Sequence, residues 1–211
     1  MSVLTRAALL ERLKNPKDDF AIMPLLDEET QVDHAAINLR LGTKFILTRK
    51  TRYPLLRPKN IDEHEIRKFQ KKESLCFGQA LVIHPQQLLL ASSFEFISMP
   101  SDLCGFVLTR SRYARAGLMI ATAAYVHPNW RGCLTLELVN YGEVPVELIC
   151  GSQIGQLALL EAKPAEPSEE RRSIPVGPEF PTMCDDPEWS KLESLGFQDK
   201  RGNELREKFK R

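Results

Sequence analysis

From residue 75 to residue 160 the chain is a series of short apolar runs separated by turn signals. The runs are rich in leucine and β-branched residues, and their regular spacing is typical of an all-β barrel or sandwich. No amphipathic helix of crossover length lies between them, which argues against a parallel α/β sheet. Alternation stops at 109–117, where one turn of helix is expected to interrupt the sheet. The pattern therefore predicts a mainly β fold with a few short helices.

Two further elements are predicted before this region. In residues 3–15 apolar side chains recur at helical spacing between charged ones, which predicts an amphipathic helix. Its apolar positions are Leu4, Ala7, Ala8 and Leu10. Residues 37–48 alternate as a strand does, and Gly42 in the middle of the run predicts a bend or a bulge.

Charge and proline mark two segments of a different kind. Residues 49–73 are charge-rich and break the strand pattern, so we expect a solvated loop with a short helix. The chain from 162 to 211 is first rich in proline and charge and then reads as a polar helix with a basic tail. We expect a β-barrel domain over 1–161, which includes the N-terminal helix and the charged insertion. Residues 162–211 would form an extension that packs on an oligomer or a partner.

The composition excludes several classes of protein. A chain of 211 residues with 43% hydrophobic and 27% charged residues is typical of a soluble globular protein. Its formal net charge of +1 gives no general attraction to nucleic acid or to a membrane surface. No apolar run approaches the roughly 20 residues of a membrane helix, so a cytoplasmic protein is expected. The five cysteines form no C-x-x-C pair, which argues against a disulfide framework or a zinc ribbon.

The strand predicted at 133–142 holds a carboxylate in an apolar setting. Leu134, Leu136 and Leu138 point to one face, whereas Glu137 points to the other with Thr135. An ionised carboxylate is costly to bury without partners. Two interpretations follow from the residues alone: an ion pair at a sheet edge or between subunits, or a catalytic group.

A second cluster precedes it in the chain. Arg110, Ser111, Arg112 and Arg115 fall within six residues at the predicted helical turn. Guanidinium groups bind phosphate oxygens in bidentate fashion, so the cluster could hold a polyphosphate, although a solvated basic turn has the same appearance. Neither a P-loop, nor the H-x-E and P-C-x-x-C pair of zinc deaminases, nor a G-x-S-x-G elbow is present.

Three ordered motifs carry a family resemblance. The runs RSRYARAGL, HPNWRGCLTLELVN and GSQIGQL resemble the R-S-S-L-A-R-x-G-L, R-I-D-P-G-[WF]-x-G-x-[LI]-x-L-E-[LF]-x-N and G-x-x-I-x-Q-L motifs of the metal-free dCTP deaminases in the trimeric dUTPase superfamily. The matching positions are Arg110, Ser111, Ala114, Arg115, Gly117, Leu118, Pro128, Trp130, Gly132, Leu136, Glu137, Asn140, Gly151, Ile154, Gln156 and Leu157. The resemblance covers about half of the chain and implies a distorted β-barrel or jelly-roll of the dUTPase-like, β-clip type.

The resemblance also implies an activity. A deoxycytidine nucleotide, dCTP in the family, would be deaminated to dUTP and ammonia, with Glu137 as the general base and Ser111 assisting. Substrate contacts would come from Arg110, Arg112, Arg115, Ala123, His127, Thr135, Leu136 and Gln156. Magnesium would arrive on the substrate triphosphate, with no zinc and no metal held by the protein. The active sites would lie between the subunits of a homotrimer.

The sequence departs from the family pattern at four places. Tyr125 and His127 replace the arginine and the aspartate of R-I-D-P-G, and Arg112 replaces the second serine of the first motif. No counterpart of the family's C-terminal closing segment follows Lys163. The dUTPases use the aspartate of R-I-D-P-G to orient the attacking water. A dUTPase-type enzyme that releases pyrophosphate is therefore the less favoured of the two enzyme functions. The departures also permit a nucleotide-binding sensor or scaffold of the same fold.

Overall fold

The computed structural model describes residues 2–49, 68–121 and 125–163, and strands dominate them. In chain order the elements are α1 (Arg6–Lys14), β1 (Ala21–Met23), α2 (Glu28–Gln31), β2 (Ile37–Thr48), β3 (Gln70–Ser74), β4 (Ala80–Ile83), β5 (Leu88–Ser98), β6 (Leu103–Thr109), α4 (Ser111–Arg115), β7 (Leu118–Ile120), β8 (Tyr125–Val126), β9 (Arg131–Asn140), β10 (Val146–Ile149) and β11 (Gln153–Glu161).

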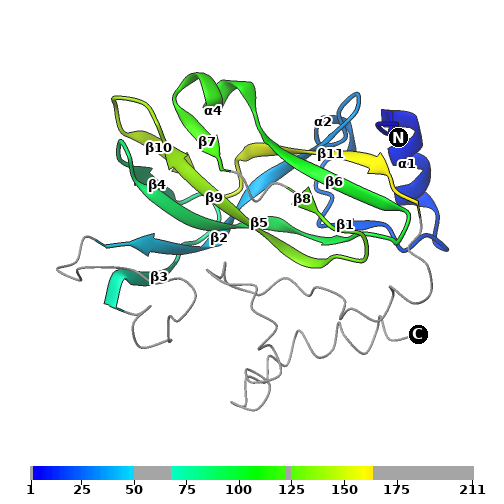
Figure 1. The fold of residues 1–211 in the computed structure, drawn as a ribbon, viewed down its shortest axis with the longest axis horizontal. Helices are drawn as coiled ribbons and strands as arrows, with labels where there is room; N and C mark the ends of the chain where they lie inside the picture. The colour runs from blue at the N-terminus through cyan, green and yellow to red at the C-terminus, as the bar shows by residue number, and fades with distance from the viewer. Residues whose placement is uncertain (1, 50–67, 122–124, 164–211) are drawn as a thin grey trace, which may run out of the picture. The chain divides into compact units, whose positions relative to one another are not determined.

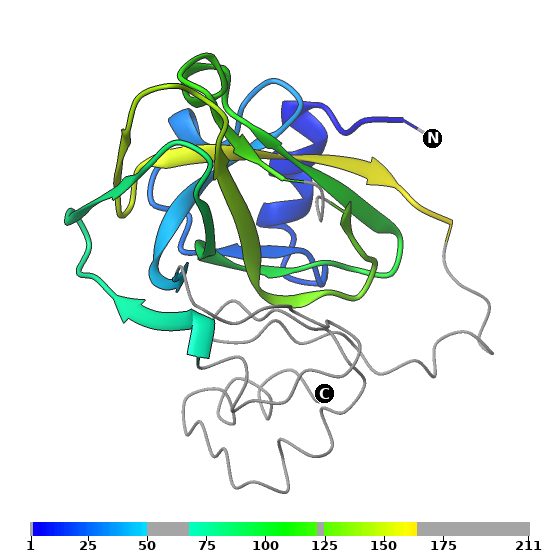
Figure 2. The same ribbon diagram turned by 60° about the vertical axis from the view of Figure 1, so that its left-hand side comes forward.

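Nine of the described strands form one curled sheet (Figure 1). Its order is β7-β9-β5-β2-β11-β6-β8, with β1 paired to β5 and β3 paired to β2, while β4 and β10 form a separate pair. Figure 2 shows how the sheet bends around its own interior. Every pairing between described strands is antiparallel, so the predicted mainly β fold is confirmed.

β9 shows why this sheet has one dry face. Leu136 and Leu138 are fully buried and Leu134 nearly so, whereas every second residue between them is half-exposed. Because side chains alternate along a strand, the three leucines pack into the core and Glu137 faces outward. The alternation predicted for this segment is confirmed.

β2 has the predicted bounds, and its central glycine is a contact point between strands. The register between β2 and β5 shifts between Leu41 and Phe45, which places Gly42 in the irregular stretch, as predicted. A Cβ on Gly42 would lie 2.6 Å from the carbonyl oxygen of Ser92 and 2.7 Å from that of Ser93. The two strands can therefore approach this closely only where β2 has no side chain.

Replacing Gly42 with alanine is expected to destabilise the fold. The new methyl group meets two carbonyl oxygens of the β5 backbone as well as the Ser92 hydroxyl, so the strands must separate, and overpacking of this kind costs about 3 kcal/mol. Urea unfolding would measure the loss. Gly78→Ala is a suitable comparison, because nothing lies within 4 Å of a Cβ there, although its φ of +83° adds some backbone strain. Equal unfolding midpoints for the Gly42 variant and the parent protein would contradict the expectation.

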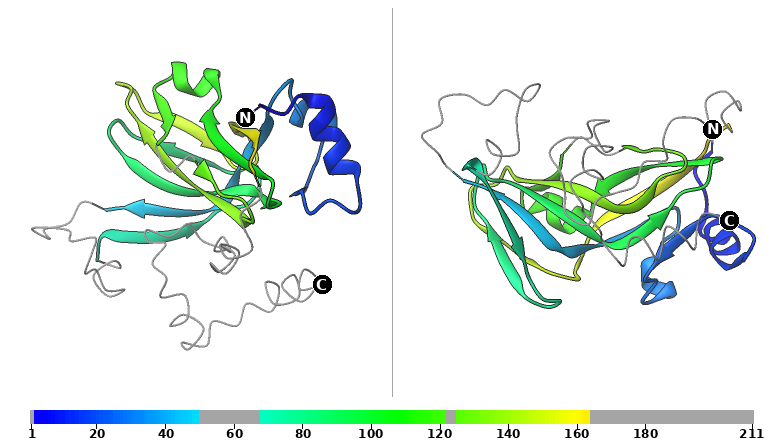
Figure 3. Two further views of the ribbon diagram at one scale, coloured as in Figure 1. Left: turned by 45° about the vertical axis from the view of Figure 1, so that its right-hand side comes forward. Right: turned by 90° about the horizontal axis from the view of Figure 1, so that it is seen from below.

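The two N-terminal helices lie at the same end of the sheet (Figure 3). α1 packs through Leu9, which is fully buried, although the predicted apolar positions of this helix did not include it. Arg12 ties the helix down, since its guanidinium is 2.9 Å from Asp102 and 2.7 Å from Asp18. The helical spacing thus predicted the element correctly but not the side chain that anchors it.

The predicted loop at 49–73 is wrong for its last residues. Gln70–Ser74 form β3, which pairs with the end of β2. This strand carries only polar side chains and is held by its backbone pairing with β2. The sequence therefore has no hydrophobic alternation there that would predict a strand. The rest of the charged insertion, residues 50–67, lies outside the described residues, as does the extension from 164 onward. The proposed division at residue 161 stays a prediction.

Candidate active site

Glu137 lies on the outer face of β9 with its carboxylate available. Leu90 lies opposite Glu137 on β5. The backbone carbonyl of Glu137 accepts a hydrogen bond from the Ala121 amide at 2.6 Å. Among the described residues, nothing forms a hydrogen bond or ion pair with its side chain. The next outward residue, Val139, pairs with Leu88 and Met119, which are both exposed. The carboxylate is therefore bordered by apolar surface and has no internal partner.

The arginine-rich segment forms the predicted helical turn, α4. Its amides close on the residue before the helix: Tyr113 and Ala114 donate to the carbonyl of Arg110 at 2.9 and 3.0 Å. The amide of Arg110 donates in turn to the carbonyl of Ile154 at 2.9 Å. Because this bond joins the start of the turn to β11, the first arginine has a fixed backbone position.

The other end of α4 is fixed to the end of β9. Gly117 has a φ of +89°, and a Cβ there would lie 2.5 Å from the amide nitrogen of Gly142. The Gly117 carbonyl accepts from the Tyr141 amide at 2.8 Å. Asn140 is fully buried and donates to the carbonyls of Ile83 and Val144. The motif glycine and asparagine thus hold the basic turn beside the strand that carries the glutamate.

The side chains of the turn differ in their surroundings. Ser111, Arg112 and Arg115 are exposed, and none of them has a hydrogen-bond partner in the described part of the chain. Arg110 is half-buried and donates from Nη1 to the side-chain oxygen of Gln153. Three of the candidate phosphate ligands are therefore presented to solvent, and the fourth is held against the sheet.

Arg110 also lines a pocket of about 370 Å³. Arg6, Glu29, Thr30, Val32, Asp33, His34 and Asn38 complete its walls. Gln156 lies behind this wall, since its amide nitrogen is 3.1 Å from Asn38 and 3.4 Å from Asp33. The structure thus brings Gln156 and Arg110 to one region.

His127 lies away from that region. Its ring stacks edge-on against Tyr125, with the centroids 4.5 Å apart, and Tyr125 stacks against Phe106. β8 pairs with β6 at Gly105, and Gly105 is five residues from Arg110, a distance of about 17 Å along a strand. In one chain His127 and Arg110 therefore lie near opposite ends of β6.

The remaining predicted residues have unequal access to a ligand. Thr135 is half-exposed on the same face as Glu137 and pairs with Ser92 on β5. Leu136 points into the core with no exposed surface, so only its backbone could touch a substrate. Ala123 lies outside the described residues.

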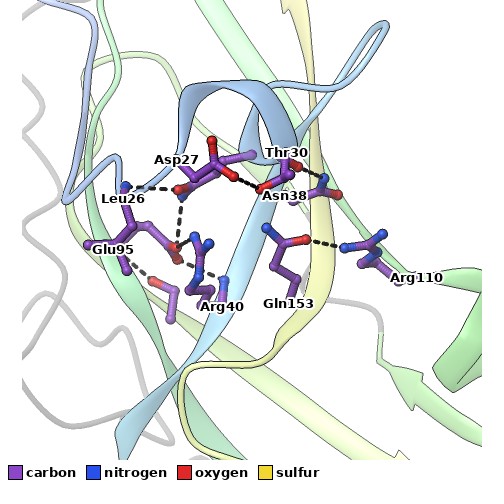
Figure 4. A network of polar contacts seen from close by, with 10 residues as sticks. Leu26, Asp27, Thr30, Asn38, Arg40, Glu95, Arg110 and Gln153 are labelled. Atoms are coloured by element: carbon purple, nitrogen blue, oxygen red, sulfur yellow. Dashed lines mark hydrogen bonds and ion pairs between the residues drawn. The ribbon is translucent and has the colours of Figure 1, made fainter. Parts of the chain in front are cut away.

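A buried carboxylate that sequence reasoning missed lies behind the pocket. Glu95 on β5 is fully buried, and its two oxygens accept from the Arg40 amide at 2.9 Å and from the Gln31 side chain at 3.0 Å (Figure 4). The Arg40 guanidinium is 3.5 Å away. Burial raises the pKa of Glu95 to about 7, and its contacts with Arg40 offset only part of that effect.

The comparisons with known proteins agree on one family. A family model described as dCTP deaminase-like matches residues 3–162. The chain belongs to the dCTP deaminase-like family. A dCTP deaminase of Halorubrum lacusprofundi is 32% identical over 91% of this chain and 92% of that protein. A dUMP-forming dCTP deaminase of Methanobrevibacter smithii is 35% identical over 74% of this chain and 79% of that protein.

The similarity to a solved structure concerns the fold. The 2'-deoxycytidine 5'-triphosphate deaminase of Agrobacterium tumefaciens superposes with a TM-score of 0.55 at 20% identity. The aligned region covers 74% of this chain and 46% of that one, so this chain spans less than half of that protein's length. The curled antiparallel sheet is thus the architecture of a dCTP deaminase.

The described residues contain neither a candidate metal-binding cluster nor a helix that could span a membrane. No group of three or more histidine, cysteine, aspartate or glutamate side chains there is arranged to hold a metal ion. None of the helices found there is both long enough and apolar enough to cross a membrane.

Proposed function

We propose that the protein deaminates dCTP to dUTP and ammonia by direct attack of water. The observation that carries the proposal is Glu137, an outward carboxylate without an internal partner, on the strand that the basic turn α4 is pinned to. Its relatives in the dCTP deaminase-like family are named dCTP deaminases, and one of the two is named as dUMP-forming.

In the proposed reaction Glu137 removes a proton from water as the oxygen attacks C4 of cytosine. The carboxyl group passes this proton to N3 as the tetrahedral intermediate forms. It then carries the proton of the new C4 hydroxyl to the exocyclic nitrogen, and ammonia leaves as the C4–N bond breaks. One water is consumed, and C4 becomes a carbonyl carbon. A carboxylate beside the ring suits both transfers, because the same oxygen can accept the proton and return it. Ser111 would hold the water or the leaving amine.

The basic turn would hold the triphosphate. Arg112 and Arg115 are exposed and unpaired among the described residues, and Arg110 is anchored at the pocket rim. Guanidinium groups form bidentate, charge-assisted bonds with phosphate oxygens. Mg²⁺ would enter with the nucleotide as part of the substrate, and the deoxycytidine base would lie towards Glu137 and Thr135.

The site would be completed by a second copy of the chain in a homotrimer. Arg110 and His127 lie near opposite ends of β6, and a homotrimer would supply them to one nucleotide from different chains. The outer face of β6 and β8 also exposes Phe106, Leu108 and Tyr125, an apolar strip that suits contact with another subunit.

A nucleotide sensor or scaffold is the alternative that the departures from the family pattern favour. His127 stands where the family pattern has an aspartate, and Tyr125 stacks on it. Such a protein would bind dCTP without consuming it. Pyrophosphate release of the dUTPase type is the weaker alternative, because a histidine cannot supply the carboxylate that orients the attacking water.

We expect dCTP and Mg²⁺ to yield ammonia and dUTP in equal amounts, with no pyrophosphate. The absent aspartate is the physical reason that the reaction stops at dUTP, although some relatives are named as dUMP-forming. A coupled ammonia assay, a pyrophosphate assay and chromatography of the nucleotides would separate the three functions. Pyrophosphate and dUMP would overturn the expected product, and binding of dCTP with neither product would favour the sensor.

A further inference from the structure

Glu95 contacts strand β2 at the point where the regular pairing of β2 with β5 ends. The β2–β5 register runs to Leu41 paired with Ser93, and the amide of Arg40, one residue before, donates instead to the Glu95 side chain at 2.9 Å. The Arg40 side chain is 11% exposed, and the Glu95 carboxylate is its partner at 3.5 Å. One buried carboxylate thus fixes both the backbone and the side chain of Arg40.

The position of Arg40 bears on the basic turn through β11. Arg40 pairs in register with Gln153, so the two side chains lie next to each other on one face of the sheet. Gln153 accepts a hydrogen bond from Arg110, and the amide of Arg110 donates to Ile154 (Figure 4). The register between β2 and β11 shifts between Gln153 and Gly155, so this part of the ladder is not held by regular pairing.

A second route runs through helix α2. Gln31, its last residue, is fully buried, donates to Glu95 at 3.0 Å, and accepts from the Leu26 amide at 3.2 Å. The same short helix supplies Glu29 and Thr30 to the pocket that Arg110 lines. The carboxylate therefore contacts two elements that line that pocket, α2 through Gln31 and β2 through Arg40.

We propose that Glu95 is a positioning residue for Arg110, acting through Arg40 and Gln153 on one side and through α2 on the other. The inference rests on the proposed function, in which Arg110 binds the substrate phosphates. Glu95 itself would touch no substrate, because it has no exposed surface.

Glutamine at position 95 is the conservative change that tests this role. It has the same shape, but it replaces one acceptor oxygen by an NH₂ group. Every neighbour that Glu95 contacts here is a donor: the Arg40 amide, the Arg40 guanidinium and the Gln31 amide. One donor would therefore face another, and β2 or α2 must shift.

The experiment is a double-mutant cycle on dCTP binding, measured by calorimetry at pH 8, where Glu95 is ionised, in a Glu137→Gln background so that dCTP is not consumed. We expect Arg110→Gln to weaken binding by about 10–100-fold, since it removes a charge-assisted bond. Glu95→Gln alone should weaken binding by about 5–10-fold, and by less than about 2-fold when Arg110→Gln is already present.

The other possible results of this cycle would overturn the positioning role of Glu95, the phosphate role of Arg110 or the proposed function, each by a different outcome. Equal weakening by Glu95→Gln in both backgrounds, or none in either, overturns the positioning role and leaves the phosphate role of Arg110 intact. Parental affinity for dCTP in the Arg110→Gln variant would overturn the phosphate role of Arg110, and the inference about Glu95 with it. A parent that binds no dCTP overturns the proposed function itself.

A swapped pair guards against simple loss of folding. Gln31→Glu with Glu95→Gln keeps one carboxylate and one amide in contact, with the Leu26 amide and the Arg40 amide both still facing an oxygen. It gives up only the long contact of 3.5 Å with the Arg40 guanidinium. We expect this variant to bind dCTP within about 2-fold of the parent. A folded swap variant that binds as weakly as Glu95→Gln would overturn the proposal. Glu28→Gln, a change in α2 that removes a solvent-facing ion pair with Lys14 of α1, serves as the matched control.

Discussion

Replacing Glu137 with glutamine is expected to lower the rate of ammonia release from dCTP by about 10²–10⁴-fold, the usual contribution of a positioned general base. The amide has the shape of the carboxylate but cannot accept a proton from water. Because Glu137 has no side-chain partner among the described residues, the change should leave the melting temperature and the affinity for dCTP nearly unaltered. A coupled ammonia assay and calorimetry would measure the two effects separately.

The control is another outward-facing strand glutamate. Glu147 on β10 is exposed and pairs with Val82, far from the basic turn in sequence. Glu147→Gln should deaminate dCTP at the parental rate. Parental activity in the Glu137 variant would remove that residue from the mechanism and leave it as a strand residue or a subunit contact.

Glu95 is expected to make the stability of the fold depend on pH near neutrality. Its pKa in the folded protein is about 7, above the ordinary value of 4.5 for a glutamate. Below pH 4.5 the group is protonated in both states. Between pH 4.5 and 7 the Glu95 side chain ionises in the unfolded chain but stays protonated in the folded protein. The stability that the protonated group contributes to the fold is therefore lost as the pH rises. The linkage amounts to about 3 kcal/mol, with the loss complete once the pH exceeds the folded pKa.

Urea unfolding of the parent and of Glu95→Gln between pH 4 and 8 measures this contribution. Groups common to both proteins cancel in the difference, including Asp27, whose pKa is lowered chiefly by the Thr30 hydroxyl. The parent should lose about 3 kcal/mol relative to the variant as the pH rises through the window. Parallel curves would mean that Glu95 ionises in the fold as readily as in the unfolded chain.

The sequence predicts those elements whose side chains alternate against a core. The strand at 37–48 was placed at the bounds of β2, and the inward leucines of β9 were assigned correctly. β3 escaped prediction because it is an all-polar strand, held by backbone pairing that no hydrophobic pattern reports.

The candidate site could be predicted only in part, for a related reason. The basic turn and Glu137 are contiguous motifs, so a sequence presents them directly. Glu95 is not: in the run FEFIS, alternation alone would place Phe94 and Phe96 inside and the glutamate outside, whereas Glu95 is buried and both phenylalanines are half-exposed. Its partners come from residues 31 and 40, and only the fold brings these near. Contacts that a second copy of the chain would supply to the site likewise cannot be predicted from the sequence of one chain.

The pairing of β2 with β11 bears on how the chain must fold. Residues 37–40 find their strand partners at 153–157, and Val3 forms a bridge with Leu160. Closing such long loops costs chain entropy before any contact is gained, so folding should take milliseconds to seconds rather than microseconds. On the ribosome β2 has no partner on its β11 side until more than a hundred further residues have been made. During that interval the nascent chain exposes an unpaired strand edge, and the folding intermediate is more prone to aggregate than the finished sheet.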